Sequence, residues 1–371
     1  MSLLRPLTSL SLTPSLAPIS HRSLLSISGS QSTLFLHGVL SSAVLPPASP
    51  QYSSFLSPQG RVLHDVFVYT RPPAVPGQPT YIIEYDSRKA DAKPLYDTLK
   101  RYVLRAKVKI RDVGEEYDVY AKWGGEGGVV GPWERSGKNG WVWSKSGSGA
   151  VQPVWGDKDA DWPWGREHSR IRDRRAVGMG ERILVPKGEL PPESATHALL
   201  PSSSYTLHRI LHGVPEGTHD IPPHSAFPME SNFDISDAVD FRKGCYVGQE
   251  LTVRTYHTGA IRKRVFPVLI HGVDEKPTEV TLNPSFPSLP TDSDIKPVLT
   301  PRAPDDDLPP IPRPRGSGKL LTNMQGVGLA LMRLEQLDAA TRGDMTLQVQ
   351  GPEGKMYGVS HWVPEGFPID V

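Results

Sequence analysis

Residues 243–250 read Lys-Gly-Cys-Tyr-Val-Gly-Gln-Glu and contain Cys245, the single cysteine of the 371-residue chain. Gly244 and Gly248 predict a tight loop, because glycine adopts positive φ and lets other backbone approach closely. Such a loop can display a thiol and can point successive backbone N–H groups at a ligand. We expect a strand directly after it, over residues 251–257.

Three cationic residues lie close to the cysteine in sequence, namely Arg242, Lys243 and Arg254. Nearby cations favour the thiolate, which is the nucleophilic and metal-binding form of the side chain. A lone cysteine is just as often a small buried hydrophobe, and the residues alone leave both interpretations open. One cysteine does exclude an internal disulfide, and it excludes an all-cysteine cage for zinc or a cluster within one chain.

A helix is expected upstream of the cysteine loop, from a Ser204 cap to Gly213. Its apolar stripe consists of Leu207, Ile210 and Leu211. His208 and His212 have the spacing of a metal-binding pair. However, Arg209 follows the first histidine where zinc proteases carry a glutamate, so we do not expect a metal there.

The remaining pattern mixes strands and helices, which indicates an α+β fold. Alternation puts Val62, His64, Val66 and Val68 on one face of a strand. A helix is expected over residues 94–106, and further strands over 81–85, 107–111, 117–121, 326–332, 346–350 and 355–360.

Two segments interrupt this pattern. Residues 122–168 are rich in glycine and hold seven of the eight tryptophans, from Trp123 to Trp164. They could form a ligand platform, but without periodicity an insertion that packs on a neighbouring surface is favoured. Residues 275–318 are rich in Pro, Thr, Ser and Asp, which is typical of a disordered linker.

The overall composition is nearly neutral, with a net charge of +1, and gives no electrostatic reason to expect nucleic acid as a partner. No apolar run is long enough for a membrane span. Residues 1–23 contain Arg5 and Arg22, many serines and no acid, and the first carboxylate of the chain is Asp65. This composition predicts a mitochondrial transit peptide and import into the matrix, with a mature start near residues 20–30.

The motif at 243–250, with Gly-Val-Pro-Glu-Gly at 213–217 upstream and the 254–264 stretch downstream, resembles the signature of the YgfZ/GcvT-like family. It is most similar to the mitochondrial branch that acts late in making [4Fe–4S] clusters. Further resemblances lie at 54–65 (SFLSPQGRVLHD), at Asp173-Arg174-Arg175 with Gly180 and Arg182, and at 326–333 (GVGLALMR).

This resemblance implies an α+β fold of three parts around a central, folate-sized cavity. The parts are a discontinuous N-terminal domain, a ferredoxin-like domain and a C-terminal β-barrel. The expected division of the chain is a transit peptide at 1–23, a first GcvT-like region at 24–121, the Gly/Trp-rich insertion at 122–168, a second GcvT-like region at 169–265, and a barrel at 266–371 that contains the linker at 275–318.

The resemblance also implies the site residues. Cys245 matches the functional cysteine of the family, and it would be the ligand to an iron that is shared with a partner. Lys243 lies beside it and is expected to be a second active residue. Gly244, Gly248 and Gln249 match the loop that holds the cysteine.

For the cofactor, Arg209 and Gly213 match a framework beside the pterin. The glycine-cleavage enzymes have a pterin-gripping glutamate at the position of Leu211, so Glu230 and Asn232 are the substitutes that this chain offers. We therefore expect tetrahydrofolate to bind weakly.

The function implied is that of an assembly factor that helps to convert [2Fe–2S] units into [4Fe–4S] clusters for recipients such as aconitase and lipoyl synthase. One cysteine supplies one ligand, so the cluster would be shared transiently with an A-type scaffold protein or completed by glutathione. The alternatives are a folate-dependent aminomethyl or methyl transferase and an adaptor that only holds partner proteins. The cysteine favours the assembly factor, because transferases of this fold have no use for it.

Overall fold

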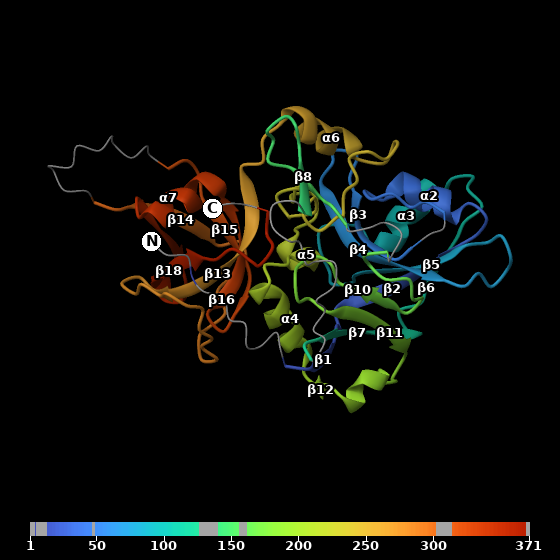
Figure 1. Cartoon of the computed structure of the whole chain (residues 1–371), viewed down its shortest axis with the longest axis horizontal. Helices are drawn as coiled ribbons and strands as arrows, with labels where there is room; N and C mark the ends of the chain where they lie inside the picture. The colour runs from blue at the N-terminus through green and yellow to red at the C-terminus, as the bar shows by residue number, and fades with distance from the viewer. Residues whose placement is uncertain are drawn as a thin grey trace.

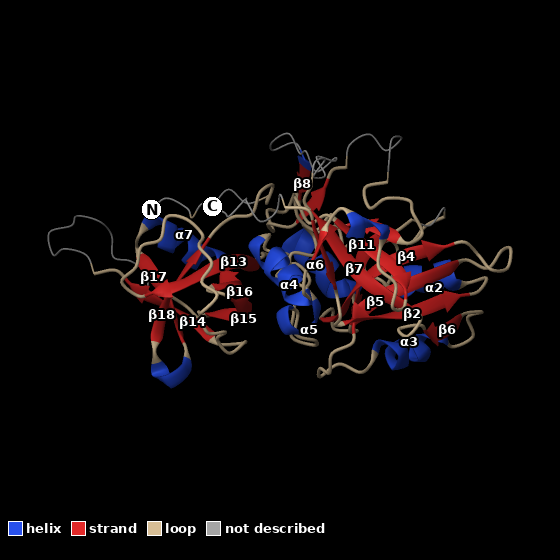
Figure 2. Cartoon of the chain, turned by 90° about the horizontal axis from the view of Figure 1, so that it is seen from below, coloured by secondary structure: helices blue, strands red, loops and turns tan. Residues whose placement is uncertain are grey.

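The computed structural model describes residues 4, 13–46, 49–125, 140–155, 162–301 and 314–368. Two five-stranded sheets pack together in the larger body, and a closed six-stranded barrel forms the other end of the molecule (Figure 1). Figure 2 shows α4 (Ser202–Leu211) and α5 (Gly217–Asp220) between the barrel and the sheets. Within the described ranges, no helix combines the length and apolarity that a bilayer crossing requires. The expected α+β, three-part fold is confirmed.

The first sheet is ferredoxin-like. Its strand order is β3-β4-β5-β2-β6, and all neighbours are antiparallel. If β3 is left aside, the other elements follow one another in the chain as β2, α2, β4, β5, α3 and β6. This is the βαββαβ order of a ferredoxin-like domain. The elements are β2 (Arg22–Ser28), α2 (Ser32–Val39), β3 (Gln51–Leu56), β4 (Val62–Arg71), β5 (Thr80–Asp86), α3 (Leu95–Val103) and β6 (Lys109–Asp112).

Strand β4 is buried on both faces, so its sequence cannot follow a simple inside–outside alternation. Val66 and Val68 pack in the cluster under α2 and α3, whereas Val62 and Phe67 pack in the cluster between the two sheets. The prediction that Val62 shares a face with Val66 and Val68 is therefore wrong. The pairing of β3 with β4 shifts register here, because Phe55 pairs with His64 but the next residue, Leu56, pairs with Val62. This irregularity places the Val62 side chain on the opposite side of β4.

The second sheet is discontinuous in sequence, as expected. Its order is β10-β11-β7-β1-β12, so the N-terminal strand at residues 15–18 lies between a strand at 117–123 and a strand at 198–199. The elements are β1 (Ser15–Pro18), β7 (Tyr117–Trp123), β10 (Arg170–Arg172), β11 (Glu181–Pro186) and β12 (Ala198–Leu199), with a short 3-10 turn at Pro192–Ala195.

This topology corrects the end of the expected transit peptide. Residues Ser15–Pro18 pair with β7 on one side, and Ser15 and Leu16 pair with β12 on the other. The Arg22 side chain has no exposed surface and forms ion pairs with Asp65 and Glu84. A leader that ended at residue 23 would remove a central strand and a buried cation, which favours an earlier end; the transit peptide itself stays a prediction.

The barrel has the closed order β13-β16-β15-β14-β17-β18. Two expected boundaries change. The barrel begins at Lys263 rather than 266, because β13 is one continuous strand. Residues 275–318 are also not simply a linker, since β14 lies within them and pairs with β15 and β17; only 302–313 fall outside the described residues. The elements are β13 (Lys263–Gly272), β14 (Asp294–Leu299), β15 (Gly318–Met324), β16 (Val327–Arg333), α7 (Leu334–Arg342), β17 (Met345–Gln350), a 3-10 turn (Pro352–Gly354) and β18 (Met356–His361).

The tryptophan-rich segment packs against the body in large part. Trp123 and Trp164 are buried in the cluster between the sheets, and the Trp162 indole donates to the Pro50 carbonyl. The segment also forms a hairpin of β8 (Trp141–Trp143) and β9 (Val151–Pro153). Trp143 is the exception, because 47% of it is exposed. Residues 126–139 and 156–161, which include Trp133, lie outside the described part.

Candidate functional site

The cysteine loop lies on the surface, and Cys245 is exposed. Gly248 has φ 82° and its α-carbon approaches Ser57 and Leu56 so closely that a β-carbon would lie 2.8 Å from that of Leu56. The predicted need for glycine is therefore confirmed at this position. Gly244 differs, because its φ is not positive and no atom lies within 4 Å of where its β-carbon would be.

The segment after the loop is a helix, α6 (Gln249–Thr258), and the strand predicted there is wrong. Gly248 in the left-handed conformation precedes the first turn. The Gln249 side chain accepts a hydrogen bond from the Tyr246 backbone N–H (3.1 Å), and the Tyr246 hydroxyl contacts the Thr252 hydroxyl (2.8 Å). These contacts with the loop select the helix over the strand that threonine and valine favour intrinsically.

Lys243 holds the other side of the loop. Its ammonium donates hydrogen bonds to the carbonyls of His37 (2.6 Å), Leu40 (2.7 Å) and Ser42 (3.0 Å), at and beyond the end of α2. Burial lowers the pKa of Lys243 to about 8, and the carboxylate of Asp240 opposes this effect. The three carbonyls give Lys243 an anchoring role, because they occupy all three of its donors. Its predicted role as an active group beside Cys245 stays a prediction.

A cavity lies where α4 ends, near the segment that follows the barrel. Tyr52, Arg175, His212, Asn232, Glu365 and Phe367 are among its lining residues. The cavity is small, with room for about one or two water molecules. A pterin ring does not fit this space as it stands.

The residues expected to hold folate differ in their position relative to this cavity. Of Arg209, Glu230 and Asn232, only Asn232 lines the cavity. Its amide nitrogen donates to the Val265 carbonyl (2.8 Å). Leu211 packs in an apolar cluster with barrel residues.

The other two residues have other roles. Arg209 donates to the Asp220 carboxylate and the Val214 carbonyl. Burial raises the pKa of Glu230, and its carboxylate stays away from the cavity lining. The cavity that Asn232 lines therefore does not fit a pterin in this conformation.

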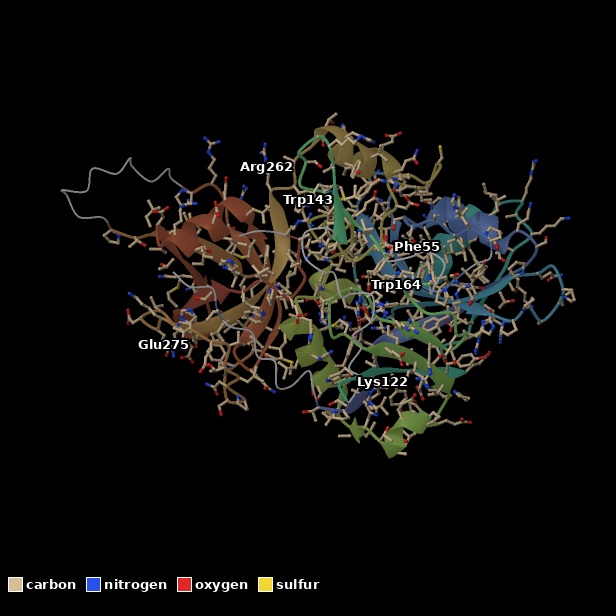
Figure 3. All side chains as sticks on the ribbon, viewed as in Figure 1. Phe55, Lys122, Trp143, Trp164, Arg262 and Glu275 are labelled. Atoms are coloured by element: carbon tan, nitrogen blue, oxygen red, sulfur yellow. The ribbon has the colours of Figure 1, made fainter. Side chains whose placement is uncertain are left out.

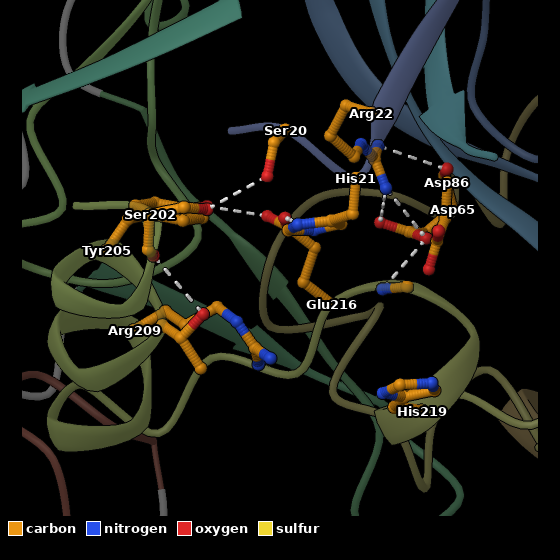
Figure 4. Close-up of polar contacts among 12 residues, drawn as sticks. Ser20, His21, Arg22, Asp65, Asp86, Ser202, Tyr205, Arg209, Glu216 and His219 are labelled. Atoms are coloured by element: carbon orange, nitrogen blue, oxygen red, sulfur yellow. Dashed lines mark hydrogen bonds and ion pairs between the residues drawn. The ribbon is translucent and has the colours of Figure 1, made fainter. Parts of the chain in front are cut away.

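A buried network of charges lies between the two sheets and α4, and Figure 4 shows the part of it around Arg22, Asp65 and Glu216. Glu216 accepts from the Tyr205 hydroxyl (2.6 Å), and it pairs with Arg175 (2.8 Å) and Arg182 (3.0 Å). Arg182 on β11 also pairs with Glu84 on β5, so the network joins both sheets. The participants with nearly complete burial are Arg22, Asp65, Glu84, Asp173, Arg175, Arg182, Tyr205 and Glu216.

Sequence reasoning missed this network. It identified Glu216, Asp173, Arg175 and Arg182 only as parts of stretches that resemble family motifs. The sequence did contain a usable signal, because both the Asp173–Arg182 stretch and the 213–217 stretch contain charged residues. Charged side chains that become buried need partners of opposite charge, so these two stretches could have been predicted to pair. Its carboxylates are paired with buried cations, which gives the network a structural role.

His208 and His212 do not form a metal site. The His208 ring stacks on Trp123 with ring centroids 4.5 Å apart, and burial holds its pKa well below the usual range. Among the residues that the structure describes, no group of three or more histidine, cysteine, aspartate or glutamate side chains could hold a metal ion.

Comparisons with known proteins give a consistent result. No family model matches the chain. It is 36% identical to an iron–sulfur cluster assembly factor IBA57 homolog, mitochondrial, of Cryptococcus neoformans, over 93% of this chain and 94% of the relative. Identity to the homologs of Coccidioides immitis and Mycosarcoma maydis is 37% and 31%, over 85% and 96% of this chain and 71% and 85% of the relatives. The solved structure of the glycine cleavage system aminomethyltransferase T from Bartonella henselae matches with TM-score 0.56 and 12% identity, over 98% of this chain and 91% of that one.

Proposed function

Because the chain belongs to the IBA57 family of mitochondrial iron–sulfur cluster assembly factors, we propose that it helps to convert [2Fe–2S] units into [4Fe–4S] clusters in the mitochondrial matrix. The recipients are apoproteins of the aconitase and lipoyl synthase type. The observation that carries this proposal is the exposed thiol of Cys245, on a loop fixed at both sides by Lys243 and Gly248.

The chemistry of one exposed thiolate requires a partner. An iron–sulfur cluster is commonly held by four thiolates, and Cys245 can supply one of them. The cluster is therefore cargo that this chain shares with an A-type scaffold protein. Exposure of the thiol is what such sharing needs, because a buried cysteine could not reach iron held by another protein.

Aminomethyl transfer is less well supported. The likeness to the aminomethyltransferase is a likeness of fold at 12% identity. The position of the pterin-gripping glutamate is Leu211, which packs against the barrel, and the cavity has space for water only. Any tetrahydrofolate binding would be weak and would need the cavity to open.

The test is rescue of [4Fe–4S] enzyme activity in cells that lack the endogenous protein. Cys245→Ser keeps the size of an exposed side chain but stays protonated at neutral pH, so it should be expressed normally and fail to restore aconitase activity. Anaerobic reconstitution of the wild-type chain with an A-type scaffold should then give the absorption and Mössbauer spectra of a [4Fe–4S] cluster.

The matched control is Ser288→Ala, which changes an exposed serine far from the cysteine loop in sequence. It should rescue fully. Full rescue by well-expressed Cys245→Ser would overturn the proposal, and an adaptor role that only holds partner proteins would replace it.

A further inference from the structure

One end of the ferredoxin-like sheet carries three connecting segments that lie side by side. Ser28 pairs with Thr80 on one side and with Lys109 on the other. Arg71 also pairs with Thr80, so the chain enters or leaves the sheet at the same end at all of these residues. We call the segments at this end the sheet tip, and they are 28–34 from β2 into α2, 71–80 from β4 to β5, and 100–109 from the end of α3 into β6.

Hydrogen bonds hold the segments of the sheet tip together. The Lys107 backbone N–H donates to the Gln31 side chain (2.6 Å), and the Ser32 hydroxyl donates to the Pro79 carbonyl (2.7 Å). The sheet tip is therefore one built surface rather than three independent loops. Figure 3 shows side chains that project outward at this end of the molecule, opposite to the barrel that carries Glu275.

Each segment of the sheet tip exposes an aliphatic side chain. Leu104 is 88% exposed, Leu34 69% and Val75 49%. A single exposed leucine is ordinary on a protein surface and needs no explanation. One apolar side chain from each of three adjoining segments is a different case, and it indicates a contact surface.

Leu104 also has a backbone conformation that leucine does not favour. Its φ of 45° and ψ of −109° are close to the first central position of a type II′ turn, where glycine is preferred. The Ala106 backbone N–H closes this turn on the Val103 carbonyl (2.8 Å). Neither packing nor backbone preference explains a leucine here, because the side chain is almost wholly exposed. The strained position points to a contact outside the chain.

The sheet tip is positively charged. Its three segments contain no acidic residue, in a chain whose net charge is only +1. Lys100, Arg101 and Arg105 flank Leu104 in the chain, are exposed, and form no ion pair within the described ranges. Asp97, one turn before Lys100 on α3, is an exposed carboxylate next to the tip. The other cations of the tip are Arg71, Lys107 and Lys109.

We propose that the sheet tip docks on a bilayer surface rich in anionic phospholipid. The cations would lie at the headgroup phosphates, while Leu34, Val75 and Leu104 would enter the boundary with the acyl chains. Aliphatic side chains favour a bilayer over nucleic acid, whose bases stack on aromatic rings. Three aliphatic side chains and a few cations give reversible attachment to the surface.

Docking at the sheet tip leaves the cysteine loop free. Helix α2 begins at the tip with Ser32, and the carbonyls of His37 and Leu40 near its other end hold Lys243, two residues before Cys245. The eight residues of α2 span about 12 Å, so the thiol stays away from the bilayer. The proposal therefore does not depend on the proposed function, and Cys245→Ser should bind vesicles like the wild type.

The test is flotation of the purified full chain with lipid vesicles. Phosphatidylcholine vesicles with about one fifth cardiolipin should carry the protein at low salt, whereas pure phosphatidylcholine vesicles should not, and high salt should release it. Arg101→Glu combined with Arg105→Glu should lower the affinity for the anionic vesicles at least about tenfold. The matched control, Lys276→Glu combined with Lys355→Glu, reverses two exposed cations on the barrel and should change the affinity less than about twofold.

Leu104→Gly distinguishes a membrane contact from a structural role. Glycine suits the φ of this position, so the variant should keep or raise the melting temperature. It should nevertheless weaken vesicle affinity about three- to tenfold, because it removes a side chain that enters the bilayer. Leu190→Ser, which changes a leucine that is 53% exposed elsewhere, should bind like the wild type.

The proposal is overturned if the wild type does not float with cardiolipin vesicles at low salt. It is also overturned if the charge-reversed tip and Leu104→Gly float like the wild type. Hydrogen exchange with and without vesicles should show protection at 72–79 and 104–107, and protection at another face instead would contradict docking through the tip. If the wild type ignores vesicles but binds a random oligonucleotide through Arg101 and Arg105, the tip is a nucleic-acid site and the membrane is the wrong partner.

Discussion

Glu216 provides the sharpest test of how the two sheets are held together. Its carboxylate contacts the Tyr205 hydroxyl and the guanidinium groups of Arg175 and Arg182, and it has no exposed surface. Glu216→Gln keeps the shape but removes the negative charge between two buried cations. Breaking a buried ion pair on one side costs about 3–5 kcal/mol, because the remaining charge has no water to solvate it. That is a large part of a typical unfolding free energy of about 5–15 kcal/mol.

The assay is urea denaturation followed by tryptophan fluorescence, which reports on Trp123 and Trp164 between the sheets. The control is Glu335→Gln, whose side chain is 65% exposed and whose pair with Arg333 should be worth at most about 1 kcal/mol. A loss below about 1 kcal/mol for Glu216→Gln would refute the reasoning, since it would mean that water or another anion replaces the carboxylate.

The contribution of Glu216 to the free energy of unfolding is predicted to depend on pH. Burial alone would raise the pKa of Glu216, but Arg182 and Arg175 outweigh it and hold the pKa well below the usual range. A depressed folded-state pKa stabilises the protein above the unfolded pKa of about 4.3, and this contribution is lost as the pH falls through the folded value. Wild-type stability should therefore fall steeply below about pH 4, and Glu216→Gln should flatten that decline.

Three further predictions concern the chain start, the loop and the folate site. A chain that starts at Thr13 should fold cooperatively in thermal denaturation, whereas one that starts at Leu24 should not, because it lacks β1 and the Arg22 cation; a stable Leu24 chain would contradict the central position of β1. Lys243→Met should lower the unfolding free energy by about 1–3 kcal/mol, because it leaves the three carbonyls of Lys243 without their donor, while the exposed control Arg242→Met should change it by less than about 0.5 kcal/mol. Leu211→Glu should destabilise the α4–barrel contact without tightening folate binding, and calorimetry that gave a submicromolar tetrahydrofolate Kd for the wild type would show that the cavity opens.

The motif around Cys245 predicted part of the fold because one of its glycines, Gly248, serves a specific contact. Gly248 is needed where the loop crosses Ser57 and Leu56, inside another stretch that also resembled the family. Contact between the cysteine loop and the 54–65 stretch restricts which residues fit at both places. Such restrictions leave recognisable residue types in the sequence. Period-based strand predictions were confirmed where one face is exposed, as at β17 (Met345–Gln350), whose residues alternate between buried and half-buried or exposed.

The errors have a common origin in contacts between segments far apart in sequence. Thr252 and Val253 favour a strand locally, yet they lie in a helix that the cysteine loop stabilises. Residues at 294–299 looked like linker, yet they complete the barrel by pairing with β17. Arg22 looked like part of a leader, yet its charge is buried with Asp65 and Glu84.

The sequence by itself determined the family, the three-part architecture and the cysteine that carries the proposed chemistry, because these depend on residue types at fixed spacing. Only the tertiary structure decided which charges are buried and which contacts hold the cysteine loop. Both depend on distances between elements that are tens to hundreds of residues apart. Those distances are set by how the sheets, α6 and the barrel pack, and that packing minimises the free energy of the whole chain rather than of any one segment.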